Sequence, residues 1–193
     1  FRGRVIFPVH TLSGKVVAFG GRILTTDKKV AKYVNSPESE IYHKSSELYG
    51  IYFAKQAIVK QDRCFLVEGY TDVIMLHQAG WENTVGTCGT ALTEKQAKIL
   101  KKYCNTILLM RDGDSAGQKA TRRDIEILIA LGFIIKVISL PNKMDPADAF
   151  KTDGMLSAYY SIAPQILDLK DGVEYYLDFL EASNWDKENF IDK

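Results

Sequence analysis

The sequence has few of the residues that mark disulfide-stapled, zinc-binding or membrane-spanning proteins. Its 193 residues include three cysteines and three histidines, and no two cysteines form a CxxC pair. Cys64, Cys88 and Cys104 are set among apolar residues, which predicts inert, buried thiols in a reducing compartment rather than a zinc site or a disulfide framework. No apolar run reaches about 18 residues, so we expect a soluble chain without a transmembrane helix.

Charge is distributed unevenly along the chain, although the net charge is only +1. Residues 1–63 contain 11 Lys and Arg against 5 Asp and Glu, residues 64–150 contain 10 against 10, and residues 151–193 contain 4 against 9. A basic segment beside one that carries many carboxylates favours a polyanionic partner, although solvated lysines give the same pattern.

The apolar pattern predicts a β-hairpin first and alternating strands and helices afterwards. The hairpin is expected over residues 4–24 and a helix over residues 46–60. Further strands are predicted at 64–68, 83–87, 106–110 and 133–140, and further helices at 71–79, 93–103 and 115–131. Continuous apolar strands that alternate with helices indicate a parallel sheet covered on both faces. From about residue 154 the chain is expected to be helical, with 173–182 as its best amphipathic stretch.

Capping spacings mark the starts of two of these helices. Thr93 precedes Gln96 by three residues, and Ser115 precedes Gln118 by the same interval. This spacing is typical of a capping box, in which the two side chains satisfy each other's backbone amides. The sequence therefore predicts Thr93 and Ser115 as N-caps.

Acidic residues follow three of the predicted parallel strands. They are Glu68 and Asp72, Asp112 and Asp114, and Asp145 and Asp148. Parallel strands end at one edge of a sheet, where such folds bind ligands. Carboxylates gathered there cannot all remain ionised without a cation. Their hard oxygen ligands suit Mg²⁺, and two such ions can promote an in-line displacement at phosphorus.

Each acidic feature also has a purely structural interpretation when it is taken alone. Asp-Gly is common in turns, and Glu68 or Asp72 could serve as an N-terminal acid of the following helix. Three acidic clusters at three successive strand ends favour the metal site over these interpretations.

Several segments, in order, resemble one protein family. VEGYTDV (67–73), RDGDSAG (111–117) and DPAD (145–148) are similar to the three acidic motifs of a Toprim domain. RVIFPV, AFGGRIL, KYVNSPES and YHKSSELYG precede them in the order found in the RNA polymerase core of bacterial DnaG-type primases. The resemblance covers roughly residues 1–150.

The resemblance implies an α/β fold in three parts. A Toprim domain is expected at 63–153, with a mainly parallel sheet covered by helices on both faces. It would follow part of a mixed α+β basic subdomain at 1–62 and precede part of a helical subdomain at 154–193. The chain would then be a segment of a longer protein, with a zinc-binding template reader upstream and a helicase-binding domain downstream.

The resemblance also implies an activity, which is synthesis of short RNA primers on a single-stranded DNA template by metal-dependent nucleotidyl transfer. The expected cofactor is Mg²⁺, with Mn²⁺ as a substitute. The expected partners are the DNA template, nucleoside triphosphates, the RNA primer and, through a domain absent from this chain, the replicative helicase. The expected location is the bacterial cytoplasm at the replication fork, with no membrane contact.

The family's functional residues correspond to ten positions of this chain. The catalytic acids would be Glu68, Asp112 and Asp114, and Asp72, Asp145 and Asp148 would complete the metal shell. Arg22, Lys32, Asn35 and Lys44 match positions that line a basic groove for template and nucleotide phosphates. Lysines and arginines neutralise phosphates in this way without reading bases.

The sequence departs from the family pattern at two positions near the acids. Arg111 occupies a place where relatives usually carry an aromatic residue, and it could reach a phosphate or cap the strand end. Ala147 follows Pro146 where the motif is commonly Asp-Pro-Asp, which leaves open whether Asp148 or only Asp145 binds metal. Three alternatives to a primase also stay open, namely a Toprim nuclease, a topoisomerase and a non-catalytic nucleic-acid clamp.

Overall fold

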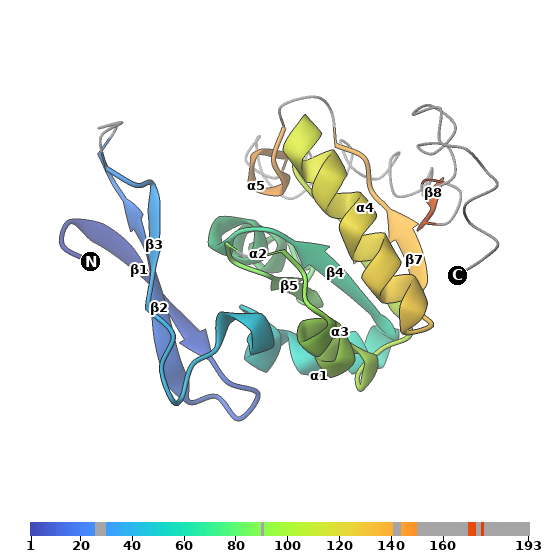
Figure 1. Ribbon diagram of the computed structural model, residues 1–193, viewed down its shortest axis with the longest axis horizontal. Helices are drawn as coiled ribbons and strands as arrows, with labels where there is room; N and C mark the ends of the chain where they lie inside the picture. The colour runs from blue at the N-terminus through green and yellow to red at the C-terminus, as the bar shows by residue number, and fades with distance from the viewer. Residues whose placement is uncertain (26–29, 90, 141–143, 150–169, 173–174, 176–193) are drawn as a thin grey trace.

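An antiparallel sheet lies beside a helix-covered, mainly parallel sheet (Figure 1). The computed structural model describes residues 1–25, 30–89, 91–140, 144–149, 170–172 and 175. The antiparallel sheet has the order β1-β2-β3, with bounds Arg4–His10, Val16–Ile23 and Tyr33–Asn35. Its first two strands confirm the hairpin predicted from the sequence.

The second sheet has the order β5-β4-β6-β7-β8, and its first four strands run parallel. The bounds are β4 Arg63–Val67, β5 Thr84–Gly86, β6 Thr106–Leu109, β7 Ile134–Val137 and β8 Lys170–Asp171. β8 pairs antiparallel with β7. The predicted parallel sheet is confirmed, but Lys170–Asp171 form a strand within the segment that was expected to be helical. Most of that segment, including nearly all of 173–182, lies outside the described residues.

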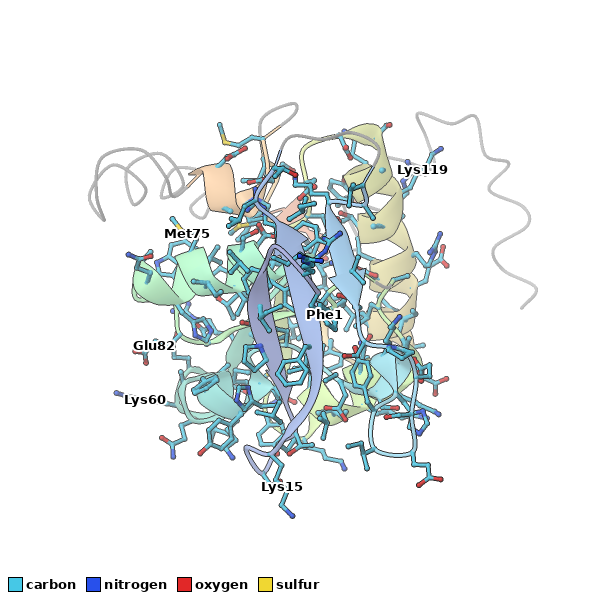
Figure 2. All side chains as sticks on the ribbon, turned by 90° about the vertical axis from the view of Figure 1, so that its left-hand side faces the viewer. Phe1, Lys15, Lys60, Met75, Glu82 and Lys119 are labelled. Atoms are coloured by element: carbon cyan, nitrogen blue, oxygen red, sulfur yellow. The ribbon has the colours of Figure 1, made fainter. Side chains whose placement is uncertain are left out.

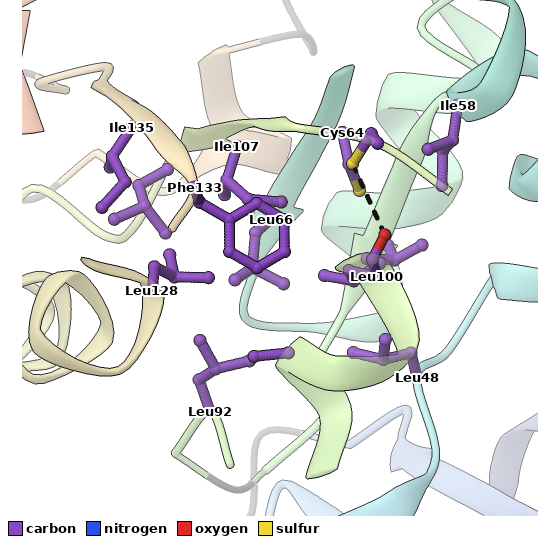
Figure 3. Packing of buried hydrophobic residues seen from close by; sticks show 14 of the residues in the cluster. Leu48, Ile58, Cys64, Leu66, Leu92, Leu100, Ile107, Leu128, Phe133 and Ile135 are labelled. Carbon is purple, nitrogen blue, oxygen red and sulfur yellow. Dashed lines mark hydrogen bonds between the residues drawn. The ribbon is translucent and has the colours of Figure 1, made fainter. Parts of the chain in front are cut away.

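Helices cover both faces of this sheet, as predicted. They are α1 Ile51–Gln61, α2 Tyr70–Gln78, α3 Glu94–Lys101, α4 Ser115–Ala130 and the short α5 Pro146–Ala149, with a 3-10 turn at Lys44–Ser46. Successive strand residues point to opposite faces. Cys64 and Leu66 therefore pack with α1, α3 and α4 (Figure 3), whereas Phe65 and Val67 pack with α2.

The two capping predictions had different outcomes. At α3 the Thr93 hydroxyl accepts a hydrogen bond from the Gln96 amide at 3.2 Å, and the Gln96 side chain accepts one from the Thr93 amide at 3.0 Å. At α4 the prediction of Ser115 was wrong by one residue. Asp114 is the N-cap, and its Oδ1 accepts a hydrogen bond from the Gly117 amide at 2.8 Å. Asp and Ser are equally good caps, so spacing alone did not separate these neighbours.

A cluster of aromatic rings holds the antiparallel sheet against α2. Phe7 on β1 stacks on Tyr70 with ring centroids 5.0 Å apart, and Tyr49 meets the same ring edge-on at 4.7 Å. The Tyr70 hydroxyl donates a hydrogen bond to Asn35 Oδ1 at 2.9 Å. These contacts bring β3 beside the start of α2, which fixes the basic strands next to the acidic end of the parallel sheet.

The predictions about the cysteines and about a transmembrane helix can be checked within the residues that the structure describes. Cys64 and Cys104 are buried and free, as predicted, and burial raises the pKa of the Cys104 thiol to about 12. Cys88 is free but partly exposed. No helix among the described ranges is long and apolar enough to cross a membrane.

Candidate active site

A cleft of about 400 Å³ opens where the parallel sheet faces the antiparallel sheet. It is lined by Arg22, Lys32, Tyr33, Glu68, Gly69, Thr71, Asp72, Met75, Gly89, Asp112, Asp145 and Ala147. The structure thus brings together four of the six predicted acids and two of the four predicted basic-groove residues. The acids meet there because parallel strands end at the same edge, and Arg22 and Lys32 come from the antiparallel sheet that packs beside it.

Glu68 directly follows β4 and is the least satisfied acid of the cleft. Its Oε1 atom is buried and accepts no hydrogen bond from the described residues. Glu68 does not cap α2, because Gly69 is the N-cap and the Gly69 amide donates to Asp72 instead. A buried carboxylate oxygen without a partner costs free energy, so this position favours a bound positive group.

Asp72 lies in the first turn of α2 and is buried. Its Oδ2 accepts a hydrogen bond from the Gly69 amide at 2.7 Å, and its Oδ1 accepts one from the Ala147 amide at 3.2 Å. Burial raises the pKa of Asp72, and the nearby Asp145 and Glu68 raise it further. Asp72 therefore stabilises the first turn of α2 and links α5 to it, as the helix-capping interpretation predicted. It also lies near the other acids.

Asp112, two residues beyond the last apolar residue of the β6 segment, is half-buried. Burial raises the pKa of its carboxyl from an ordinary value of 3.8 to about 7, and repulsion from Glu68, Asp72, Asp145 and Asp114 adds to the rise. Repulsion of this kind requires the acids to lie near one another. The convergence that the strand pattern predicted is therefore present in the fold.

The other two predicted acids do not line the cleft. Asp114 is exposed and caps α4. Asp148 is exposed, and its amide donates a hydrogen bond to Asp145 Oδ1 at 2.6 Å. Asp145 thus uses one oxygen at the start of α5 while it also faces the cleft.

The cleft fits a divalent cation by the chemistry of its ligands. No group of three or more His, Cys, Asp or Glu side chains among the described residues is already arranged to hold a metal ion. The available ligands are nevertheless all carboxylate oxygens, which Mg²⁺ prefers. The unpartnered oxygen of Glu68 and the raised pKa of Asp112 both indicate negative charge that the described residues do not neutralise.

Two cations face these acids from the antiparallel sheet. Arg22 lies on β2 and Lys32 immediately precedes β3, and both are 5.8 Å from the centre of the Tyr33 ring. The Tyr33 hydroxyl is 3.4 Å from the Thr71 hydroxyl on α2. Cation–π contacts of this kind hold a positive group over a ring without neutralising its charge. Arg22 and Lys32 can therefore still attract phosphates.

Asn35 and Lys44 have surroundings that differ from those of Arg22 and Lys32. The Asn35 amide donates to the Cys88 carbonyl at 3.1 Å and accepts from Tyr70, so both ends of its side chain serve the fold. The Lys44 backbone amide donates to Glu38 Oε1 at 2.9 Å, and the Lys44 side chain is not among those that line the cleft.

Arg111 does not line this cleft, and it caps the end of the neighbouring strand β4 rather than that of its own strand β6. It is buried and forms an ion pair with Asp124 of α4, in which the Arg111 Nε donates to Asp124 Oδ2 at 2.8 Å. Its Nη1 donates to the Val67 carbonyl at 3.0 Å. Asp124 was not among the residues predicted from the sequence. The available signal was its position on the apolar face of α4, one residue before Ile125 and four before Leu128.

Comparisons with known proteins match both halves of the chain. Residues 65–150 match the Toprim-like family, and residues 1–55 match the N-terminal domain of the DNA primase catalytic core. The DNA primase of Clostridium acetobutylicum is 47% identical over 154 residues, which are 80% of this chain and 25% of that protein. The chain belongs to the bacterial DNA primase family.

Solved primase structures have the same fold. The crystal structure of a DNA primase domain from Pseudomonas aeruginosa has a TM-score of 0.84 at 39% identity, covering 95% of this chain and 56% of that chain. The structure of the DnaG primase catalytic domain bound to ssDNA also has a TM-score of 0.84, at 32% identity, covering 95% and 57%. The chain spans about a quarter of the length of the curated primases it matches.

Membership in the primase family argues against the topoisomerase and nuclease alternatives. Toprim motifs alone are shared with topoisomerases and nucleases, but the residues before the Toprim match belong to a primase core. The two matches together favour a primase over those alternatives. The expected domain boundaries, after residues 62 and 153, stay a prediction. Helix α1 falls within the expected N-terminal part, but it packs on the parallel sheet.

Proposed function

We propose that this chain contains the nucleotidyl-transfer site of a primase, which synthesises RNA primers on single-stranded DNA from nucleoside triphosphates. One observation supports this most strongly, namely that two cations and four acids line the same cleft. Cations suit phosphates, and acids suit the metal ions that phosphates share. A binding clamp would gain nothing from the acids, because they repel nucleic acid.

Glu68 and Asp112 are the proposed main ligands of Mg²⁺, for which Mn²⁺ would substitute. Asp72 and Asp145 would position water or a second ion from one side of the cleft. Asp114 and Asp148 are proposed only in supporting roles, because Asp114 caps α4 and Asp148 is exposed in the first turn of α5. When bound, Mg²⁺ would neutralise phosphate charge and lower the pKa of the attacking hydroxyl. The carboxylates would keep that charge fixed beside the reacting phosphate.

Arg22 and Lys32 are proposed to hold nucleotide and template phosphates from the opposite wall, with Asn35 and Lys44 extending the groove. In the reaction, a ribose hydroxyl forms a bond to the α-phosphorus of a nucleoside triphosphate. The bond from that phosphorus to the bridging oxygen breaks, pyrophosphate leaves and the hydroxyl proton passes to solvent. The two cations would orient the triphosphate so that attack occurs in line.

The proposed partners follow from this reaction. They are the single-stranded DNA template, nucleoside triphosphates and the RNA primer, together with a replicative helicase that would bind a domain outside this chain. The related DnaG catalytic domain is described as bound to ssDNA, which supports the template as a partner here. The proposed location is the bacterial cytoplasm.

Calorimetric titration of Mn²⁺ into the chain, with and without adenosine triphosphate, tests the site. We expect saturable binding that strengthens with the nucleotide and weakens at least about a hundredfold in Asp112→Asn, because a main ligand is lost. Glu82→Gln is the matched control. Glu82 is exposed and follows the far end of α2 (Figure 2), so its variant should bind Mn²⁺ normally.

Absence of Mn²⁺ binding under both conditions would mean that the acids do not act together and would refute the proposal. If Mn²⁺ binds, incorporation of labelled ribonucleotides on single-stranded DNA then identifies the reaction. Cleavage of the DNA with metal and without nucleotides would indicate a nuclease instead.

A further inference from the structure

A second cleft of about 400 Å³ lies on the other side of Glu68. It is bounded by the start of α4 and by the loop that follows β5, and it shares Glu68 and Gly89 with the first cleft. Met75 lines the first cleft and Lys119 lines the second, and Figure 2 shows these two residues on opposite sides of the molecule. Glu68 therefore borders two clefts whose other walls come from different elements.

One face of α4 provides the wall of this second cleft. Ala116, Lys119, Ala120 and Arg123 all line it. Their spacing of three and four residues places them on one side of a helix. The two alanines have short side chains and leave space between the two long cationic side chains. A ligand can therefore approach the α4 backbone and reach both cations at once.

The charges of Lys119 and Arg123 are available to a ligand. Both side chains are exposed. Across the part of the chain that the structure describes, neither forms an ion pair within 4.0 Å. Arg111 also lines the second cleft, but its charge is already paired with Asp124. Within the described residues the recess thus presents two cations that form no ion pair, near the shared carboxylate of Glu68.

We propose that the second cleft is a phosphate-binding subsite, in which Lys119 and Arg123 hold a phosphate-bearing reactant opposite the one held by Arg22 and Lys32. This inference rests on the proposed function, because nucleotidyl transfer requires two phosphate-bearing reactants to meet at the metal ligands. Each cleft has the volume of a pocket for a single small ligand. Glu68, which borders both, lies where the two reactants would meet.

The ligand phosphate could belong to a nucleic-acid backbone or to a nucleoside triphosphate, and two binding measurements distinguish these sources. The double variant Lys119→Gln/Arg123→Gln is compared with Lys95→Gln/Lys102→Gln. The control removes the same charge from two exposed positions, Lys95 on α3 and its C-cap Lys102, which line neither cleft. Labelled oligo(dT) is one probe across a salt series, and adenosine triphosphate with Mn²⁺ is the other.

If the subsite holds a nucleic-acid backbone, oligo(dT) binding should weaken roughly tenfold in the test variant only. The slope of log affinity against log salt should also decrease by about 1.4, for two phosphate contacts on a single strand. If it holds a triphosphate, adenosine triphosphate binding should weaken roughly tenfold and oligo(dT) binding should not change. Equal effects of the test and control variants on both probes would overturn the proposal.

Failure of this inference can be told apart from failure of the proposed function. The test variant should bind Mn²⁺ alone as the wild type does, because Lys119 and Arg123 ligate no metal. Loss of Mn²⁺ binding only in Asp112→Asn, with no phosphate effect in the test variant, would refute the subsite and leave the metal site. The single variant Lys119→Gln, on an exposed helical position, repeats the test if the double variant does not fold.

Discussion

Arg111 and Asp112 are neighbours in the sequence, but the fold treats their charges in opposite ways. The Arg111 side chain is 3% exposed and paired with Asp124, which is 1% exposed. Asp112 is half-buried among other acids, and it forms no ion pair with a cation among the described residues. The Arg111 charge is satisfied within the fold, whereas we propose that the Asp112 charge is satisfied by a ligand. This contrast separates a structural ion pair from the proposed binding site at the end of the same strand.

Breaking the buried pair should give the largest loss of stability. We expect Arg111→Met to lower the free energy of unfolding by about 3–5 kcal/mol, because Asp124 would remain buried without its partner. Urea unfolding, monitored by circular dichroism, measures this loss. By contrast, Asp112→Asn should leave the metal-free fold as stable as the wild type or more stable, since it removes a repelled charge.

The double variant Arg111→Met/Asp124→Leu is the control for the buried pair. Replacing both charges with apolar side chains of similar volume is often neutral or stabilising, so most of the lost stability should return. If Arg111→Met alone unfolds at the urea concentration of the wild type, the pair does not hold β6 and α4 together, and the contrast with Asp112 fails.

Much of this fold could be predicted from apolar pattern alone, because the pattern depends on burial. Val67 and Met110 end continuous apolar runs, and their segments are parallel neighbours although α2, β5 and α3 lie between them in the sequence. The gathering of acids at one edge of the sheet could be predicted from these parallel strands. The N-cap of α4 could not be predicted, because Asp114 and Ser115 are equally suitable caps and the backbone conformation decides between them.

The partner of Arg111 was harder to predict for a physical reason. Asp124 lies 13 residues away, and an ion pair of this kind depends on how α4 packs on the sheet. A carboxylate on the apolar face of a helix does, however, require a buried partner. Arg111, next to an apolar strand, was one candidate for that partner. The second cleft could not be predicted at all, because its walls come from separate loops and one helix face.

Substitution of Gly117 should have a smaller effect, since it would displace the backbone of Asp112 without removing the charge of its side chain. A Cβ atom at Gly117 would lie 2.1 Å from the Asp112 carbonyl oxygen, far inside van der Waals contact. Gly117→Ala should therefore cost about 1–3 kcal/mol of stability and weaken Mn²⁺ binding by displacing Asp112. Gln118→Ala, at the next and exposed position, is the control and should change neither quantity, as alanine favours helices.

The pH dependence of stability should show the smallest effect and the clearest sign. The pKa of Asp112 is about 7 in the folded chain against an ordinary value of 3.8, so the folded state binds the proton more tightly. Metal-free stability should therefore decline as pH rises from about 4 to about 7. One proton gives a slope of at most about 1.4 kcal/mol per pH unit, and solvent screening of this half-exposed group reduces it.

Melting temperatures measured from pH 4 to pH 8, with and without Mn²⁺, check this sign. Because a metal ion competes with the proton for the same carboxylate, saturating Mn²⁺ should flatten the decline or reverse it. Asp112→Asn cannot titrate, so its metal-free profile should be flatter than that of the wild type. Identical profiles for the two proteins would show that Asp112 is solvated like an ordinary carboxylate. In that case the contrast with Arg111 would be one of exposure, not of unsatisfied charge.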